Sequence, residues 1–197
     1  TPQWQIEDIH GKKVILIRRF DRDGEWRIPF ISAMSMLNAK DNEHHSYLEI
    51  ADAIRQYGAT PKHDLKELWK RIVFNILISN TDDHLRNHAF LYRSPKGWSL
   101  SPVYDINPTP IEIKPRILTT AIDFDDGTAD LNLALSVYDY FDLSKAEAHN
   151  IIYDVGTAVS AWRDVAKTIG ISNAEINRMS SAFEHKDLEC ALHIKRI

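Results

Sequence analysis

The sequence predicts a mainly helical fold with a small β portion at its start and one β-hairpin embedded among the helices. Three observations support this fold class. Short apolar runs separated by turn residues fill the first 30 positions. Apolar residues recur with helical spacing over most of the chain from residue 31 onward. A β-type stretch with a Pro-Lys-Gly turn interrupts that helical pattern at residues 88–102.

The β portion comes from two pairs of strand-like runs. WQIEDI and KKVILIRRF flank His10 and Gly11, a dipeptide that favours a turn. A second turn signal, DRDG, precedes the run EWRIPFI. We therefore expect strands up to about residue 30 and helix from Ile31 onward, beginning with ISAMSMLNA.

Two helices follow with clear start and stop signals. In the segment SYLEIADAIRQYG, Ser46 is the expected N-cap and Gly58 the stop. The segment 60–79 is the strongest helix, because Thr60 fits a cap and Pro61 the first helical position. Its wide apolar face predicts burial in the middle of a domain, and it consists of Leu65, Leu68, Trp69, Ile72, Val73, Ile76 and Leu77.

The second half of the chain begins with the hairpin and then becomes helical. HAFLYR and GWSLSP form the two arms of the hairpin, and the Pro-punctuated VYDINPTP follows as an extended segment. Helices are expected over residues 129–141, 144–169 and 172–185. The last two begin with capping boxes, which pair Ser144 with Glu147 and Ser172 with Glu175.

Composition excludes several classes of protein. The formal net charge is -4 without a dense cluster of Lys and Arg, which argues against direct nucleic-acid binding. The single cysteine, Cys190, cannot form an intrachain disulfide and favours a reducing compartment, the cytoplasm. No apolar run approaches the roughly 20 residues that span a bilayer, so no membrane association is expected. The first residues lack the apolar stretch of a signal peptide, and the missing initial Met indicates a piece of a longer protein.

Three polar residues around the hairpin form a candidate catalytic group. Asp82 follows the end of the buried helix, Asn87 comes five positions later, and Asp105 follows the hairpin. Because a hairpin brings its two ends together, Asp105 is expected near the other two. Phosphoryl transfer uses such a set, with one carboxylate for the attacking hydroxyl and an amide and a second carboxylate for Mg²⁺. The pattern Asp-x4-Asn alone is weak, and the following hairpin with its Asp makes it more specific.

The segments FNILISNTDDHLRNHAFLY and WSLSPVYDINP resemble the C-terminal region of HipA-type serine/threonine kinases, the toxins of bacterial toxin–antitoxin pairs. The resemblance covers essentially the whole chain and is thin after about Asp130. It implies a protein-kinase-like C-lobe that uses ATP and Mg²⁺. By this resemblance Asp82 is the catalytic base, and Asn87 and Asp105 are the Mg²⁺ ligands. His84 would brace the loop or touch the transferring phosphate, and Arg86 would face phosphate.

The segment VILIRRFDR resembles the hinge strand of the same family, whose backbone meets the adenine of ATP. By this resemblance Arg18 and Phe20 lie on the hinge. Residues 1–30 would then be the hinge and the end of the N-lobe, and residues 31–197 the helical C-lobe. The chain lacks the family's phosphate-gripping loop and the lysine before the hinge, so this chain by itself is expected to be nearly inactive.

The resemblance implies a kinase that phosphorylates a Ser or Thr of a bacterial protein and arrests growth, with a DNA-binding antitoxin as partner. Three alternatives remain. A phosphoinositide-type lipid kinase shares the pattern Asp-x-His-x-x-Asn, and a non-catalytic interaction module could keep the fold. A metal-dependent phosphohydrolase could use His84 and His88, whose i, i+4 spacing suits zinc on a helix, with His44, His45 and His63 nearby in sequence.

Two further acidic features receive structural interpretations. Asp83 is expected to cap a turn in the loop, without a catalytic role. The stretch DFDDGTAD lacks the spacing of an EF-hand and is expected to be a solvated loop.

Overall fold

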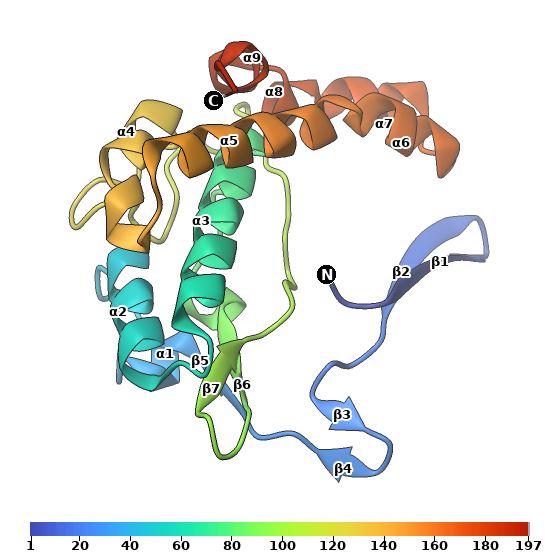
Figure 1. The fold of residues 1–197 in the computed structure, drawn as a ribbon. Coiled ribbons are helices and arrows are strands. Elements are labelled where there is room, and N and C mark those ends of the chain that lie inside the picture. Colours follow the sequence, from blue (N-terminus) through green and yellow to red (C-terminus); the bar gives the residue numbers. More distant parts are fainter. Residues whose placement is uncertain (197) are drawn as a thin grey trace.

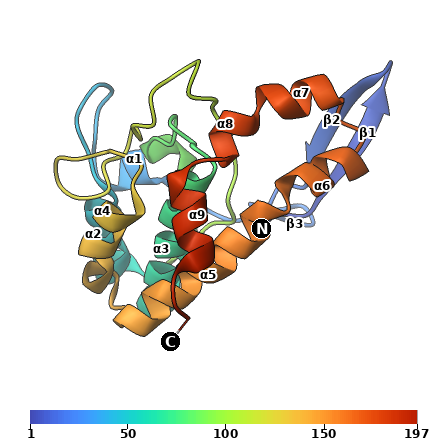
Figure 2. The same cartoon turned by 90° about the horizontal axis from the view of Figure 1, so that it is seen from above.

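The computed structural model describes residues 1–196 and shows a helical body with small sheets (Figure 1). One sheet lies at an end of the body, and two short hairpins lie to one side of it. The helix α3 runs through the middle of this body, with α2 and α5 packed against it. The first two strands lie apart from α2 and α3, and their ribbon passes near the C-terminal helices (Figure 2). The mainly helical prediction with a small β portion is confirmed.

The first ribbon matches the predicted strands. Strand β1 (Trp4–Ile9) pairs in antiparallel register with β2 (Lys12–Ile17) around the turn at His10 and Gly11. Both turn residues have positive φ, 52° and 77°, as a tight two-residue hairpin turn requires. A second, very short hairpin follows, made of β3 (Arg22–Asp23) and β4 (Trp26–Arg27).

The expected start of helix at Ile31 is wrong. Ile31 belongs to β5 (Phe30–Ser32), which pairs with β6 (Ala89–Tyr92), and the helix α1 covers only Ala33–Met36. The cause is a contact between segments about 60 residues apart, in which Ile31 lies opposite Phe90. Local periodicity carries no information about such a partner.

The two helices before the loop begin and end where the sequence predicts. Helix α2 (Tyr47–Tyr57) starts after Ser46, whose amide donates to Glu49 at 2.7 Å, and ends at Gly58. Helix α3 (Pro61–Leu77) has Thr60 as its N-cap residue and Pro in its first turn. The seven apolar residues predicted for its buried face are all 0% exposed. This helix is therefore the central element of the core, and the candidate loop begins at its C-terminal end.

The predicted hairpin is confirmed as β6 and β7 (Trp98–Leu100), and the sheet order is β5-β6-β7. The 3-10 turn η1 (Leu85–Asn87) lies one residue before β6. The loop that contains Asp82 is therefore fixed between the buried end of α3 and a buried strand.

The C-terminal half is helical but more divided than predicted. The expected helix over residues 144–169 breaks at Ala161, and the expected helix over 172–185 breaks at Met179. After the first break Trp162 stacks on Phe183 with 4.4 Å between ring centroids, a contact that a continuous helix pattern does not reveal. The elements are α4 (Leu131–Ser136), η2 (Tyr138–Phe141), α5 (Lys145–Ser160), α6 (Trp162–Thr168), α7 (Asn173–Arg178), α8 (Ser180–Phe183) and α9 (Lys186–His193).

Within residues 1–196, none of the helices has the length and apolar character needed to cross a membrane.

Candidate active site

The hairpin brings the two expected metal ligands into contact. Nδ2 of Asn87 lies 3.2 Å from the backbone oxygen of Asp105 and 3.4 Å from its Oδ2. Asn87 is buried at the end of η1, whereas Asp105 is exposed on the segment after β7. The hydroxyl of Tyr104 donates to the backbone oxygen of Arg86 at 2.5 Å, which ties the same two segments together a second time. The expected proximity of the two segments is therefore present.

Asp105 combines an unusual backbone conformation with a hydrogen-bonded side chain. Its φ of 55° lies in the left-handed region, where Asn and Asp are the tolerated residues after Gly. Its Oδ1 accepts a hydrogen bond of 2.8 Å from Nδ2 of Asn107. The carboxylate is thus held at a defined place beside Asn87.

Asp82 presents its carboxylate to solvent. Its side chain is 73% exposed, and Nζ of Lys114 lies 3.8 Å from its Oδ1. An exposed pair at this distance is weak, so the carboxylate remains accessible to another molecule. Lys114 is a neighbour that the sequence analysis missed, because 32 residues separate it from Asp82 and it belongs to no recognisable motif.

The two other loop residues expected to act in catalysis have distinct surroundings. Nδ1 of His84 is buried and lacks a hydrogen-bond partner among the residues the structure describes. The guanidinium of Arg86 forms an ion pair with the carboxylate of Asp41, and both side chains are at least half exposed. Arg86 would have to exchange this partner to meet a phosphate.

Asp83 is not the simple turn cap that the sequence suggests. Its side chain is 3% exposed and accepts hydrogen bonds from Tyr47, Asn75 and His88. Asn75 interrupts the buried side of α3, and a polar residue in such a position is the sequence signal that could have indicated this cluster. Tyr47 carries no comparable signal, because an aromatic residue in the first turn of an amphipathic helix is predicted to be part of the apolar core.

The expected hinge residues lie on the segment between the two small hairpins. The ring of Phe20 lies 5.8 Å from that of Tyr104 and 6.3 Å from that of Phe30. The segment around Phe20 therefore lies beside the residue that precedes Asp105. Burial raises the pKa of Tyr104 to about 12, so its phenol stays protonated. Arg18 is exposed, and its guanidinium bonds to Gln3 at 3.1 Å.

Asn87 and Asp105 suit a hard cation that also binds phosphates. One carboxylate and one amide supply oxygen ligands, and Mg²⁺ in nucleotide sites takes few ligands from the protein itself. Within the described part of the chain, no group of three or more His, Cys, Asp or Glu side chains is arranged to hold a metal ion. His84 and His88 lie on either side of the single turn η1, and Nε2 of His88 is 2.7 Å from Asp83.

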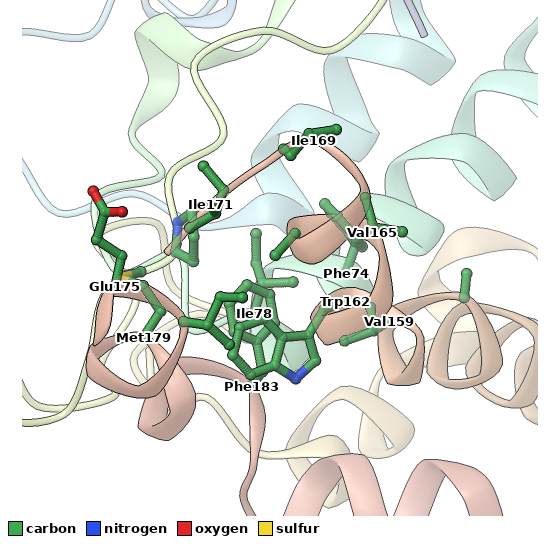
Figure 3. Close-up of a pocket in the computed structure, with 14 residues that line it drawn as sticks. Phe74, Ile78, Val159, Trp162, Val165, Ile169, Ile171, Glu175, Met179 and Phe183 are labelled. Atoms are coloured by element: carbon green, nitrogen blue, oxygen red, sulfur yellow. The ribbon is translucent and has the colours of Figure 1, made fainter. Parts of the chain in front are cut away.

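An apolar cavity of about 440 Å³ lies away from these loops, between α5 and the short helices that follow it (Figure 3). Trp162 and Phe183 stack inside it, and Phe74 and Ile78 of the α3 region close one side. Glu175 is the one acidic residue in its lining. A single carboxylate among apolar side chains lacks the group of polar residues that phosphoryl transfer uses, so the loops around Asp82 remain the candidate active site.

Comparison with known proteins identifies the family of the chain. The family model for the HipA-like C-terminal domain matches residues 1–162. A solved chain from the Shewanella oneidensis MR-1 complex of HipA, HipB and operator DNA superposes with a TM-score of 0.72 at 16% identity. That match covers 97% of this chain and 51% of the other, and at this identity it shows the fold.

Two curated relatives carry "Putative kinase" in their names. One, from Haemophilus influenzae, is 30% identical over 109 residues, which are 50% of this chain and 32% of that protein. The other, from Sinorhizobium fredii, is 29% identical over 104 residues, which are 51% of this chain and 25% of that protein. The chain thus spans about half the length of the matched solved chain, and its matches cover 32% and 25% of the two curated relatives. Its fold and the family model together show that the chain belongs to the HipA-like C-terminal domain family.

Proposed function

We propose that this chain is the C-lobe of an ATP- and Mg²⁺-dependent serine/threonine protein kinase of the HipA type. The observation that carries the proposal is the contact between Asn87 and Asp105 across the hairpin, with the exposed Asp82 on the same loop. The kinase names of the two curated relatives support it.

Each residue then has a chemical task. Asp82 orients the Ser or Thr hydroxyl of a protein substrate and accepts its proton as the oxygen bonds to the γ-phosphorus of ATP, while the bond from that phosphorus to the bridging oxygen breaks and ADP leaves. The oxygens of Asn87 and Asp105 would hold Mg²⁺, and the bound ion would neutralise charge on the phosphates. His84 keeps the loop in shape, and Arg86 can turn from Asp41 to a phosphate oxygen.

The nucleotide would lie between the hinge segment and the metal residues. Phe20 lies beside Tyr104, so the hinge backbone around Arg18 and Phe20 is next to the segment that ends in Asp105. This neighbourhood supports an adenine site at the hinge. A kinase that uses cellular ATP would act in the cytoplasm.

The partner would be an antitoxin that binds DNA. The solved complex contains HipA, HipB and operator DNA together. The net charge of -4 on this chain favours contact with DNA through such a partner over direct binding. Growth arrest would follow from phosphorylation of a bacterial protein.

The test compares Asp82→Asn with wild type in the complete natural polypeptide, each incubated with Mg²⁺-ATP and cell extract. Phosphorylated Ser and Thr are identified by mass spectrometry. We expect a loss of at least 10²-fold in phosphate transfer, because general-base catalysis typically contributes that much. Asp164→Asn is the matched control, since Asp164 is also exposed and lies 3.9 Å from a lysine.

Equal phosphate transfer by Asp82→Asn and wild type would contradict the role of Asp82. A folded wild-type protein that transfers no phosphate to protein would favour the non-catalytic interaction module, and phosphate on lipid would favour the lipid kinase.

A further inference from the structure

Asp83 holds together three elements around the candidate catalytic loop. Its Oδ2 accepts hydrogen bonds from the hydroxyl of Tyr47, from Nδ2 of Asn75 at 2.8 Å and from Nε2 of His88 at 2.7 Å. Tyr47 begins α2, Asn75 lies in the last turns of α3, and His88 directly precedes β6. One carboxylate oxygen thus joins two helices and the hairpin sheet.

The donors are matched to a buried carboxylate. A carboxylate removed from water is costly unless hydrogen bonds replace its hydration. Burial, together with the nearby charge of Asp83, raises the pKa of Tyr47 well above 10, so its phenol remains a donor. A carboxylate accepts hydrogen bonds only, so His88 must carry its proton on Nε2. The cluster is therefore polarised toward Asp83 from all three sides.

The loop backbone on both sides of Asp82 is anchored as well. The backbone oxygen of Thr81 accepts from the amide and the hydroxyl of Thr119, at 3.2 and 2.9 Å. The backbone oxygen of Asp83 accepts from the amide and the hydroxyl of Thr120, at 3.1 and 2.7 Å. Asp82 thus has an exposed side chain on a backbone that is fixed on either side.

A chain of hydrogen bonds continues from Asp83 to the segment 103–107, which contains Asp105. Asn75 bonds Asp83 through Nδ2, and its Oδ1 accepts from Asn80 at 3.1 Å. Oδ1 of Asn80 lies 3.4 Å from the amide of Asn107, and Nδ2 of Asn107 donates to Asp105 at 2.8 Å. Asp83 also accepts a hydrogen bond from His88, and this contact fixes the residue next to Asn87.

We propose that Asp83 is a positioning residue that sets the placement of Asp82, Asn87 and Asp105 relative to one another. The inference rests on the proposed kinase function for its kinetic consequence. Its structural part, the coupling of the loop to the segment 103–107, stands independently of that function. The side chain of Asp83 is buried and acts through the groups it anchors.

The kinetic test uses Asp83→Asn in the complete polypeptide, with Asp64→Asn as control. The asparagine keeps the shape and loses the charge. Asp64 is also buried and accepts from the amide of Leu100 at 3.0 Å, but it lies in the first turn of α3, about 20 Å along the helix from its end. We expect Asp83→Asn to lower kcat about 10²-fold, because misplaced catalytic groups typically cost that much. The Mg²⁺ concentration for half-maximal turnover is expected to rise about 10-fold.

A purely structural role would lower the melting temperature without these kinetic changes per folded molecule. Thermal unfolding of both variants separates the two cases. Tyr47→Phe is a milder second variant, because it removes one donor and keeps the ring that packs edge-on against His88. It is expected to change kcat in the same direction by a smaller factor. An unchanged kcat and Mg²⁺ requirement in folded Asp83→Asn would overturn the proposal.

Hydrogen exchange supplies a readout that needs no activity. In Asp83→Asn, amides of residues 80–88 and 103–107 are expected to exchange faster together, and in Asp64→Asn they are not. Faster exchange in the loop with an unchanged segment 103–107 would overturn the coupling. Absence of phosphate transfer by wild type would contradict the proposed function, and the exchange result would still decide the positioning role.

Discussion

Asp82 and Asp83 are adjacent in sequence and have opposite surroundings. The side chain of Asp82 is 73% exposed, while that of Asp83 is 3% exposed and bonded to three donors. A carboxylate that accepts a proton from a substrate must be reachable, whereas one that anchors a loop must be satisfied internally. The exposed residue therefore suits chemistry, and the buried residue suits placement.

A prediction at the scale of single residues concerns Asp105, a proposed ligand of Mg²⁺. Asp105→Asn should raise the Mg²⁺ concentration for half-maximal phosphate transfer at least tenfold, because it removes the carboxylate beside Asn87. A Mg²⁺ titration of turnover in the complete polypeptide measures this. Asp125→Asn is the control, since Asp125 is an exposed carboxylate in another loop. Identical titration curves for Asp105→Asn and wild type would remove Asp105 from the metal site.

At the scale of elements, the helix caps are the features that local sequence predicts best. Ser144 and Ser172 each begin a helix with a capping box, and at Ser46 the backbone amide donates to the Glu three residues later, as in the other two. These contacts join neighbours within one turn, so the tertiary structure has little influence on them. The breaks at Ala161 and Met179 have no comparable local signal.

Glu147 gives a pH prediction for the start of α5. The backbone amide and the hydroxyl of Ser144, and then Lys66, lower the pKa of Glu147 from 4.5 to about 2. Its stabilising effect on the fold is therefore complete above pH 4.5 and is lost as the pH falls toward 2. Wild type should be more stable than Glu147→Gln at pH 6, and the difference should shrink below pH 4.5.

Denaturant unfolding at several pH values measures this difference. Ser144→Ala is the comparison variant, because it keeps the backbone amide that donates to Glu147 at 3.1 Å and should retain part of the pH dependence. A stability difference that stays constant from pH 6 to pH 3 would contradict the capping role.

At the scale of the whole molecule, the β1–β2 ribbon differs from the helical body. Most of its residues are exposed, including Trp4, Ile15 and Ile17, and it lies apart from α2 and α3 (Figure 1). An isolated two-stranded hairpin is marginally stable in water. The sheet β5-β6-β7, in contrast, has Phe90 and Leu91 buried against the core.

This contrast predicts unequal local stability in residues 1–196. Amides of β2 that pair with β1 should exchange with deuterium at least tenfold faster than those of β6, because opening the ribbon exposes little buried surface. Hydrogen exchange resolved by residue measures both strands in one sample. Equal protection would mean that the ribbon unfolds only together with the helical body.

The sequence by itself determined the helical class, the buried face of α3, the caps, the hairpin and the spacing of Asp82, Asn87 and Asp105 along the chain. Each of these depends on residues within a few turns or on one short hairpin. The tertiary structure decided the pairing of β5 with β6, the burial of Asp83 and the neighbour of Asp82. These depend on partners far along the chain, such as Tyr47, which is 36 residues from Asp83. Local patterns cannot specify such partners, because only packing of the whole core determines which distant polar groups meet.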